Sequence, residues 1–245
     1  MQDELQTPTA YDLLRVWESG QNKHPVEQAL ALLQAALPEQ PPEALAALNL
    51  EARDRLLLML REKLSGPELE LLVDCPECSE TLEIQVQVSQ LLEAPEPEPD
   101  SRPVAAPGAT ILLRLPTSAD MLALEAAGVE GALVALLERC VVSVVETSGA
   151  ALPGLTPDML PAVAIALRNR MPLANLSFGL TCPGCEHAWT SAMEIPEVLW
   201  TEVEAEVRRV QVEVGLLAGA YGWSEEAILK MSRVRRQGYL EQLNQ

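Results

Sequence analysis

Apolar residues recur at helical spacing through the first quarter of the chain. The segments 11–18, 25–37 and 42–64 each carry leucine, alanine or valine every three or four residues, which predicts amphipathic helices. Pro25 suits a first helical turn, and the pair Gly66-Pro67 ends the third segment. Residues 1–66 are therefore expected to form an N-terminal helical region.

Two later regions change to an alternation of apolar and polar residues with a period of two. In the first, strands are predicted at 69–73 and 81–88, within the region 67–93. In the second, they are predicted at 176–180 and 188–193, within the region 174–195. Each pair of strands is interrupted by a short turn, so two hairpins are expected.

The sequence between these hairpins divides into a linker and a subdomain. Residues 94–108 hold an acidic run with proline at every second position, typical of a stiff spacer. Residues 109–173 are expected to form an inserted helical subdomain. It has a strand at 110–115, a helix from Ser118 to Glu125, a helix at 129–140, an extended piece at 141–146 and a helix at 157–171.

The last region, 196–245, is predicted to be a C-terminal helical arm. Its first helix has an apolar stripe of heptad type, formed by Trp200, Val203, Val207, Val210, Val214 and Leu217. Gly219 and Gly222 are expected to break this helix. Ser224 then caps a new helix, with Trp223 and Ile228 at the two positions of a hydrophobic staple.

Cysteines occupy both hairpin turns. The first turn reads Cys75-Pro76-Glu77-Cys78 and the second Cys182-Pro183-Gly184-Cys185. Two residues between cysteines let a tight turn aim both sulfurs at one point, and two such turns supply the four thiolates of a tetrahedral zinc site. Gly184 is expected to provide a positive φ in its turn. We therefore predict a zinc-ribbon-like β element holding one structural Zn2+ through Cys75, Cys78, Cys182 and Cys185, since four protein sulfurs leave no position for a substrate.

Redox pairs and structural disulfides are the competing interpretations of the cysteines. A redox Cys-x-x-Cys normally starts a helix, whereas a strand follows each turn here. Disulfides do not suit a chain that begins with the acidic Met1-Gln2-Asp3-Glu4 and shows no apolar signal segment. His187 can replace a cysteine ligand, although a solvated histidine at a strand edge is the simpler interpretation. Cys140 follows an apolar run and is expected to be a buried small hydrophobe.

Composition narrows the class of protein. Hydrophobic residues make up 48% of the chain, which predicts a globular protein. The longest apolar stretch, 132–145, is too short to span a bilayer, and Glu138 and Arg139 interrupt it. Thirty-six acidic residues against 17 basic ones give a net charge of -19, and aromatics are only 3%, so neither the cationic footprint nor the stacking surface of a nucleic-acid binder is present. A cytoplasmic protein without membrane or nucleic-acid partners is expected.

Catalytic motifs are missing from the sequence. It has no phosphate-binding glycine loop, no nucleophile elbow and no His-Glu-x-x-His pair, and it contains only two histidines. No pair of carboxylates stands out in an apolar setting for acid–base work. The protein is therefore not expected to be an enzyme. The fold class is expected to be α+β and mostly helical, with helical bundle parts joined to the β element that carries the two Cys-Pro-x-Cys turns.

The order of these features resembles a known family. The chain starts with helices, which are followed by the first Cys-Pro-x-Cys, an insertion, and then the second Cys-Pro-Gly-Cys with Trp189. Leu199-Trp200 and a long helix come next. The chain ends with two segments, Tyr221-Gly222-Trp223-Ser224-Glu225-Glu226-Ala227-Ile228-Leu229 and Arg235-Arg236-x-x-Tyr239-Leu240. This pattern is similar to the baseplate hub assembly chaperones of contractile phage tails and related injection systems. It covers most of 69–240, and its most specific part is the C-terminal segment. The resemblance implies a non-enzymatic factor that helps tail or baseplate proteins assemble, beside the tape-measure protein, and that is cytoplasmic or carried in the particle.

The C-terminal end is the predicted partner-binding surface. Lys230, Arg233, Arg235 and Arg236 concentrate positive charge on an otherwise acidic chain, so they are expected to steer towards an acidic patch. The complete predicted set is Trp223, Ile228, Arg233, Arg235, Arg236 and Tyr239. Two other classes stay open at this point: a zinc-ribbon regulatory or nucleic-acid-associated adaptor, and a dithiol redox protein.

Overall fold

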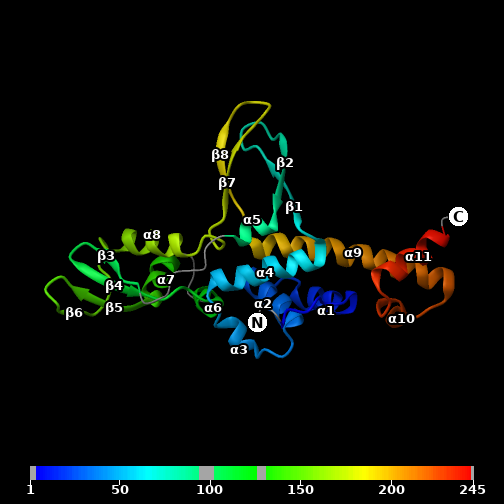
Figure 1. Cartoon of the computed structure of the whole chain (residues 1–245), viewed down its shortest axis with the longest axis horizontal. Coiled ribbons are helices and arrows are strands. Elements are labelled where there is room, and N and C mark those ends of the chain that lie inside the picture. Colours follow the sequence, from blue (N-terminus) through cyan, green and yellow to red (C-terminus); the bar gives the residue numbers. More distant parts are fainter. Residues whose placement is uncertain (1–3, 94–101, 126–130, 244–245) are drawn as a thin grey trace. The chain divides into compact units, whose positions relative to one another are not determined.

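The computed structural model describes residues 4–93, 102–125 and 131–243, and the chain forms two compact units (Figure 1). Unit 1 combines Met1–Pro41 with Pro196–Gln245, and unit 2 comprises Pro42–Ile195. The predicted α+β class with mostly helical content is confirmed. Helices make up all of the regular structure of unit 1 in the described residues, whereas every strand belongs to unit 2.

Unit 1 begins with two antiparallel helices, α1 (Ala10–Gly20) and α2 (Pro25–Ala36). Thr9 and Asp12 form a capping box at the start of α1, and Pro25 occupies the first turn of α2 as predicted. The end of α1 packs against the long helix α9 (Ile195–Tyr221). A Cβ on Gly20 would lie 2.4 Å from the indole ring of Trp200, so only glycine permits this approach.

The C-terminal arm contains α9, a short α10 (Glu225–Leu229) and α11 (Arg233–Leu243). Most of the apolar stripe of α9 is covered: Val214 is half-buried, and the other five members are buried, namely Trp200, Val203, Val207, Val210 and Leu217. The expectation that Gly219 breaks the helix is wrong, because α9 continues through it to Tyr221. Gly222 does end the helix, with a φ of 69° and its N–H donating to the carbonyl of Ala218.

Unit 2 begins with α3 (Pro42–Ala46) and α4 (Leu50–Ser65), where the sequence predicted one continuous helix. The break has a local cause. Asn49 has an extended backbone, and its side chain accepts a hydrogen bond from the N–H of Ala52 at 2.8 Å, which starts a new helix. Gly66, with a φ of 92°, ends α4 where predicted.

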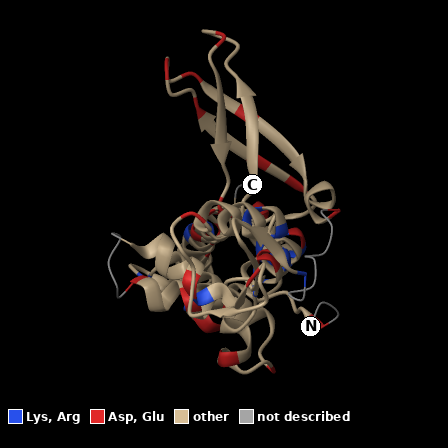
Figure 2. Ribbon diagram, turned by 90° about the vertical axis from the view of Figure 1, so that its left-hand side faces the viewer, with Lys and Arg blue, Asp and Glu red and all other residues tan. Residues whose placement is uncertain are grey.

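Two separate hairpins follow the predicted strands. The first pairs β1 (Glu68–Asp74) with β2 (Thr81–Gln87), and the helix α5 (Val88–Leu92) follows it. The second pairs β7 (Ser177–Thr181) with β8 (Ala188–Ala192). Both are antiparallel two-stranded sheets, and Figures 1 and 2 show them side by side with their turns at the same end.

The inserted subdomain holds a four-stranded antiparallel sheet that the prediction of a helical subdomain understated. Its order is β3 (Val104–Ala106), β4 (Ala109–Leu113), β5 (Val141–Glu146) and β6 (Ala151–Leu152). Strand β3 lies inside the predicted linker 94–108, of which residues 94–101 lie outside the described residues. Three helices complete the subdomain, α6 (Ser118–Glu125), α7 (Ala132–Cys140) and α8 (Leu160–Arg170).

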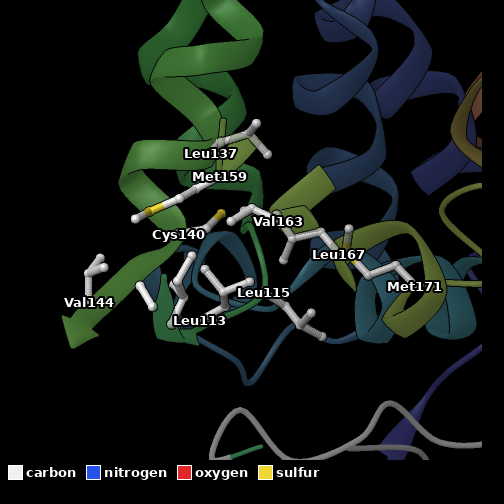
Figure 3. Close-up of a cluster of buried hydrophobic side chains, with 11 residues drawn as sticks. Leu113, Leu115, Leu137, Cys140, Val144, Met159, Val163, Leu167 and Met171 are labelled. Carbon is white, nitrogen blue, oxygen red and sulfur yellow. The ribbon is translucent and has the colours of Figure 1, made fainter. Parts of the chain in front are cut away.

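This subdomain has its own hydrophobic core (Figure 3). Side chains from β4 and β5 meet those of α7 and α8, and Ile111, Leu113, Cys140 and Val163 are fully buried. Cys140 therefore packs as the predicted small hydrophobe. The subdomain can be expected to keep its structure when the hairpins are perturbed, because almost all of its apolar contacts are internal and the exception, Leu50, lies on α4.

A buried carboxylate, Asp120, links three segments of the subdomain through hydrogen bonds. Asp120 is 3% exposed and accepts hydrogen bonds from both terminal nitrogens of Arg114, at 2.6 and 2.9 Å, and from Nε of Arg139 at 3.0 Å. The Arg114 guanidinium, with help from Thr117 and Arg139, holds the pKa of Asp120 well below its usual range. The Asp120 carboxylate also accepts from the N–H and hydroxyl of Thr117, and the N–H of Asp120 donates to the Thr117 hydroxyl, so Thr117 caps α6.

Candidate metal centre

Each hairpin turns through the same six-residue knuckle, and the two are residues 75–80 and 182–187. The strands leave them at the pairs Asp74–Thr81 and Thr181–Ala188. In the first knuckle the N–H of Cys75 donates to the carbonyl of Glu80 at 2.8 Å, and in the second the N–H of Cys182 donates to that of His187 at 2.9 Å. The two predicted turns are thus one structure used twice.

A left-handed residue follows the second cysteine of each knuckle. Ser79 and Glu186 both have a φ of 60°, and their N–H groups donate back to the carbonyls of Cys75 and Cys182. The prediction that Gly184 provides the positive φ is wrong, since the reversal occurs two residues later. A Cβ on Gly184 would lie 3.7 Å from Sγ of Cys182, an ordinary contact, so glycine is not required there.

The knuckles bring four cysteine sulfurs together. The Sγ atoms of Cys75 and Cys185 are 3.6 Å apart, those of Cys78 and Cys182 are 3.5 Å apart, and all four lie within 4.8 Å of one another. At a Zn–S bond length of about 2.3 Å, the sulfurs of a regular tetrahedron lie about 3.8 Å apart. The spacing of the four sulfurs therefore fits one tetrahedral ion.

Burial and chemistry also fit a thiolate-bound metal. Cys75 and Cys182 are 1% exposed, whereas Cys78 and Cys185 face solvent, which provides an entry path for an ion. Four soft thiolate ligands in a tetrahedral arrangement suit zinc, or the iron of an iron–sulfur site, better than cations that prefer oxygen ligands, such as Mg2+ and Ca2+. Within the described part of the chain, these four cysteines form the one group with metal-ligand geometry.

Backbone N–H groups in the knuckles point at the sulfurs. The pKa of the Cys182 thiol is lowered to about 7, chiefly because the N–H of Cys185 donates to its sulfur, and also because of the N–H of Gly184. The N–H of Glu80 acts in the same direction on Cys78, but hydrogen bonding with the neighbouring thiols outweighs it and raises the pKa of Cys78 to about 12. One thiolate thus forms readily at Cys182, whereas the raised pKa values of the Cys78 and Cys185 thiols oppose further negative charge until a cation is present.

His187 and Cys140 lie outside the group. His187 belongs to the second knuckle, but its ring stacks on Trp189, with 6.0 Å between the ring centroids. Cys140 is buried in the core of the inserted subdomain. Neither residue is among the side chains that could hold the ion.

The two ends of helix α4 are bonded to the chain at the bases of the two hairpins. At its C-terminal end it leads through Gly66 into β1, and Arg61 donates to the Gly66 carbonyl at 2.7 Å. At its N-terminal end the fully buried carboxylate of Glu51 accepts from the N–H of Leu173 at 2.8 Å and of Ala174 at 3.3 Å, just before β7. Burial raises the pKa of Glu51, although these two N–H groups oppose the rise. Sequence reasoning missed Glu51, because its partners are 122 residues away and nothing local marks them.

The predicted partner-binding residues divide into buried and accessible ones. Ile228 is fully buried, and Arg236 is 2% exposed, with Nε donating to the carboxylate of Glu213 at 2.7 Å. These two residues hold unit 1 together and do not form a surface for docking. Trp223 and Tyr239 are partly exposed and stack edge to face, with 4.8 Å between their centroids.

The remaining two predicted residues, Arg233 and Arg235, are exposed. They lie beside Val234, which is 83% exposed, and the guanidinium of Arg235 lies 5.8 Å from the centre of the Tyr239 ring. Partner binding through this surface stays a prediction.

The comparisons with known proteins give one family. Among the described residues, no helix is both long and apolar enough to cross a membrane. No match was found among curated proteins or among solved structures. A family model described as "T4 bacteriophage base plate protein" matches residues 9–199, which include both knuckles, α4 and the inserted subdomain but not most of the C-terminal arm. The match covers most of the chain, and the protein therefore belongs to the T4 bacteriophage base plate protein family.

Proposed function

We propose that this protein is a non-enzymatic assembly factor for the baseplate hub of a phage-like contractile tail or injection system, stabilised by one structural zinc ion. The family supports a role in a baseplate and contacts with other tail or baseplate proteins. The observation that carries the zinc proposal is the convergence of four Sγ atoms within 4.8 Å from knuckles more than 100 residues apart. When bound, a zinc ion with four thiolates supplies structural linkage and no open catalytic position.

The residues of the knuckles are suited to this linkage. Each contributes one buried and one exposed cysteine, so the ion would join the two hairpin ends without being sealed from solvent. A two-stranded hairpin is marginally stable alone in water. A link between the two hairpin ends would therefore fix both hairpins as one zinc-ribbon-like element.

Metal analysis tests the first half of the proposal. Protein purified without chelator is expected to contain one zinc per chain, and Cys182→Ser is expected to lose it. Cobalt substitution should give the absorption bands of a tetrahedral thiolate site. Iron in place of zinc, or less than a tenth of an ion per chain, would refute the assignment of zinc.

Particle production tests the second half. Deleting the gene in the native producer is expected to abolish assembled tails, and re-expression of the protein should restore them. An assembly factor is expected to be depleted from purified mature particles, whereas a structural component would be present at a fixed copy number. A deletion strain with a normal yield of tails would contradict both roles.

For client binding we propose the exposed surface formed by Trp223, Arg233, Val234, Arg235 and Tyr239 in unit 1. A hydrophobic side chain surrounded by arginines and aromatic rings has the composition of an interface hot spot. The client is a tail or baseplate protein, with the tape-measure protein as the first to examine. Arg235→Glu combined with Val234→Asp is expected to abolish co-purification of the client. Arg208→Glu, on the exposed side of α9, is the matched control, and an equal loss from that control would count against the surface.

A further inference from the structure

The two faces of the first hairpin have opposite character. Leu71 pairs with Ile84 and Val73 with Leu82, and these four side chains are half-buried on the inner face. The alternate positions form the outer face, where every side chain except the partly buried Gln87 is exposed. Leu72, opposite Glu83 on that face, is 74% exposed. The first hairpin thus presents an uncovered sheet face with a large apolar side chain at its middle.

Carboxylates surround Leu72 on this outer face. Glu68, Glu70 and Asp74 alternate along β1, and Glu83 lies across from Leu72 on β2. No lysine or arginine occurs between residues 65 and 101, or between 171 and 207, so neither hairpin carries a cation. Figure 2 shows the acidic positions along the hairpins without a basic one. The outer face therefore has an apolar centre and an anionic rim.

Two buried carboxylates elsewhere in the described part of the chain are each paired with two arginines. Asp120 accepts from two arginines, and Glu213 is bridged by Arg209 and Arg236. On the outer face, the hydrogen-bond donors to carboxylates are neutral, namely Thr81 to Asp74 and glutamine side chains to Glu68 and Glu83. Unpaired like charges on one ribbon repel one another and lower its stability. A cationic partner would relieve this repulsion and cover Leu72.

We propose that the outer face of the first hairpin docks a basic surface of a different protein, in which lysine or arginine side chains surround an apolar side chain that covers Leu72. A nucleic acid is excluded as the occupant by the sign of the charge. A second copy is disfavoured, because each chain carries a net charge of -19. Opposite charge would also accelerate the encounter with a basic partner. The identification of that partner as a tail component rests on the proposed function.

A photo-crosslinking amino acid tests the docking face in cells that produce the particle. Replacing Leu72 with p-benzoylphenylalanine and irradiating is expected to give one covalent product with another protein. Its crosslinked peptide should contain lysine or arginine within a few residues of the linkage. Ile165 on α8 is the control position, because it is also apolar and 61% exposed in unit 2. No product, a product with a second copy of this chain, or the same product from position 165 would overturn the proposal.

Charge variants test the electrostatic part. Glu70→Gln with Glu83→Gln, in the crosslinking background, is expected to reduce the yield about fivefold, as expected for two weakened surface ion pairs. Glu125→Gln with Glu138→Gln removes the same charge from exposed positions of the inserted subdomain and should leave the yield within about twofold. Equal effects of both pairs would show general charge attraction and refute a specific face.

The two proposals fail separately. If deletion of the gene leaves tail assembly intact while position 72 still crosslinks to a basic protein, the docking face stands and the assembly role does not. If assembly requires the protein but position 72 gives no product, the docking face alone is refuted.

Discussion

Loss of the metal link is expected to release both hairpins and to leave the inserted subdomain folded. The link joins residues that are 104 to 110 positions apart. In the chain-entropy treatment of a crosslink, closing a loop of about 100 residues contributes about 4.7 kcal/mol at 25 °C. The inserted subdomain has its own core, so fewer residues of the loop are free, but each halving of loop length lowers this contribution by only about 0.6 kcal/mol. We therefore expect Cys182→Ser to cost about 4 kcal/mol or more.

Hydrogen exchange would locate this loss. Amides of β1, β2, β7 and β8 are expected to lose protection on chelation, because each hairpin is then a two-stranded sheet without its link. Amides of α7, α8 and β4 should keep theirs, because their core is separate from the knuckles.

Cys140→Ala is the matched control for cysteine loss. It removes a buried sulfur from the core of the inserted subdomain and should cost about 1–2 kcal/mol while leaving one metal ion per chain. The reasoning is refuted if Cys182→Ser leaves hairpin exchange unchanged, or if exchange rises uniformly throughout unit 2.

Three further predictions concern local structure. Glu186→Gly is expected to stabilise unit 2 by about 1 kcal/mol, because it removes a non-glycine residue from a left-handed conformation. Denaturant titration of the metal-bound protein would measure this gain, and a loss of stability would contradict the prediction. Asp120→Asn should cost about 2 kcal/mol at pH 7, a moderate value because its arginine partners are partly exposed. Since the folded pKa of Asp120 is depressed, its contribution is complete above the unfolded pKa of about 4 and is lost as pH falls below it, so variant and wild type should converge in acid-unfolding experiments. Arg236→Ala should lower the stability of unit 1 by about 3 kcal/mol, because it removes one of the two arginine partners of the buried Glu213 and leaves Arg209 as the other, whereas the exposed Arg235→Ala should change the thermal midpoint of unit 1 little.

Local patterns were enough to predict the knuckles. The Cys-x-x-Cys spacing and the flanking period-two alternation place the four sulfurs on two hairpin ends, and the structure brings those sulfurs together. The positive φ was assigned to the wrong residue, because glycine permits that conformation but hydrogen bonding within the knuckle decides where it occurs. The helix break at Asn49 was missed because the apolar spacing continues across it, although the asparagine cap was present in the sequence.

Long-range pairing is what the sequence could not show. Arg236 reads as one more residue of a basic cluster, but its partner Glu213 lies 23 residues away and both are buried. Glu51 reads as part of a solvated helix face, but it accepts hydrogen bonds from backbone N–H groups at the end of the inserted subdomain, more than 120 residues away. Both cases depend on tertiary contacts, which no local period encodes. The client-binding role of the exposed arginines remains a prediction for the same reason.

The separation of the two knuckles along the chain has a consequence during synthesis on the ribosome. Cys75 and Cys78 emerge first, and the ribosome must add more than 100 residues before Cys182 and Cys185 follow. At about 5–20 residues per second, the first pair of thiols waits about 5–20 s without its partners. During that interval the inserted subdomain, whose core draws only on itself and on the earlier helix α4, can begin to fold, but the metal site has only half of its ligands. Completion of the site is thus a late event that reports that nearly the whole of unit 2 has been translated.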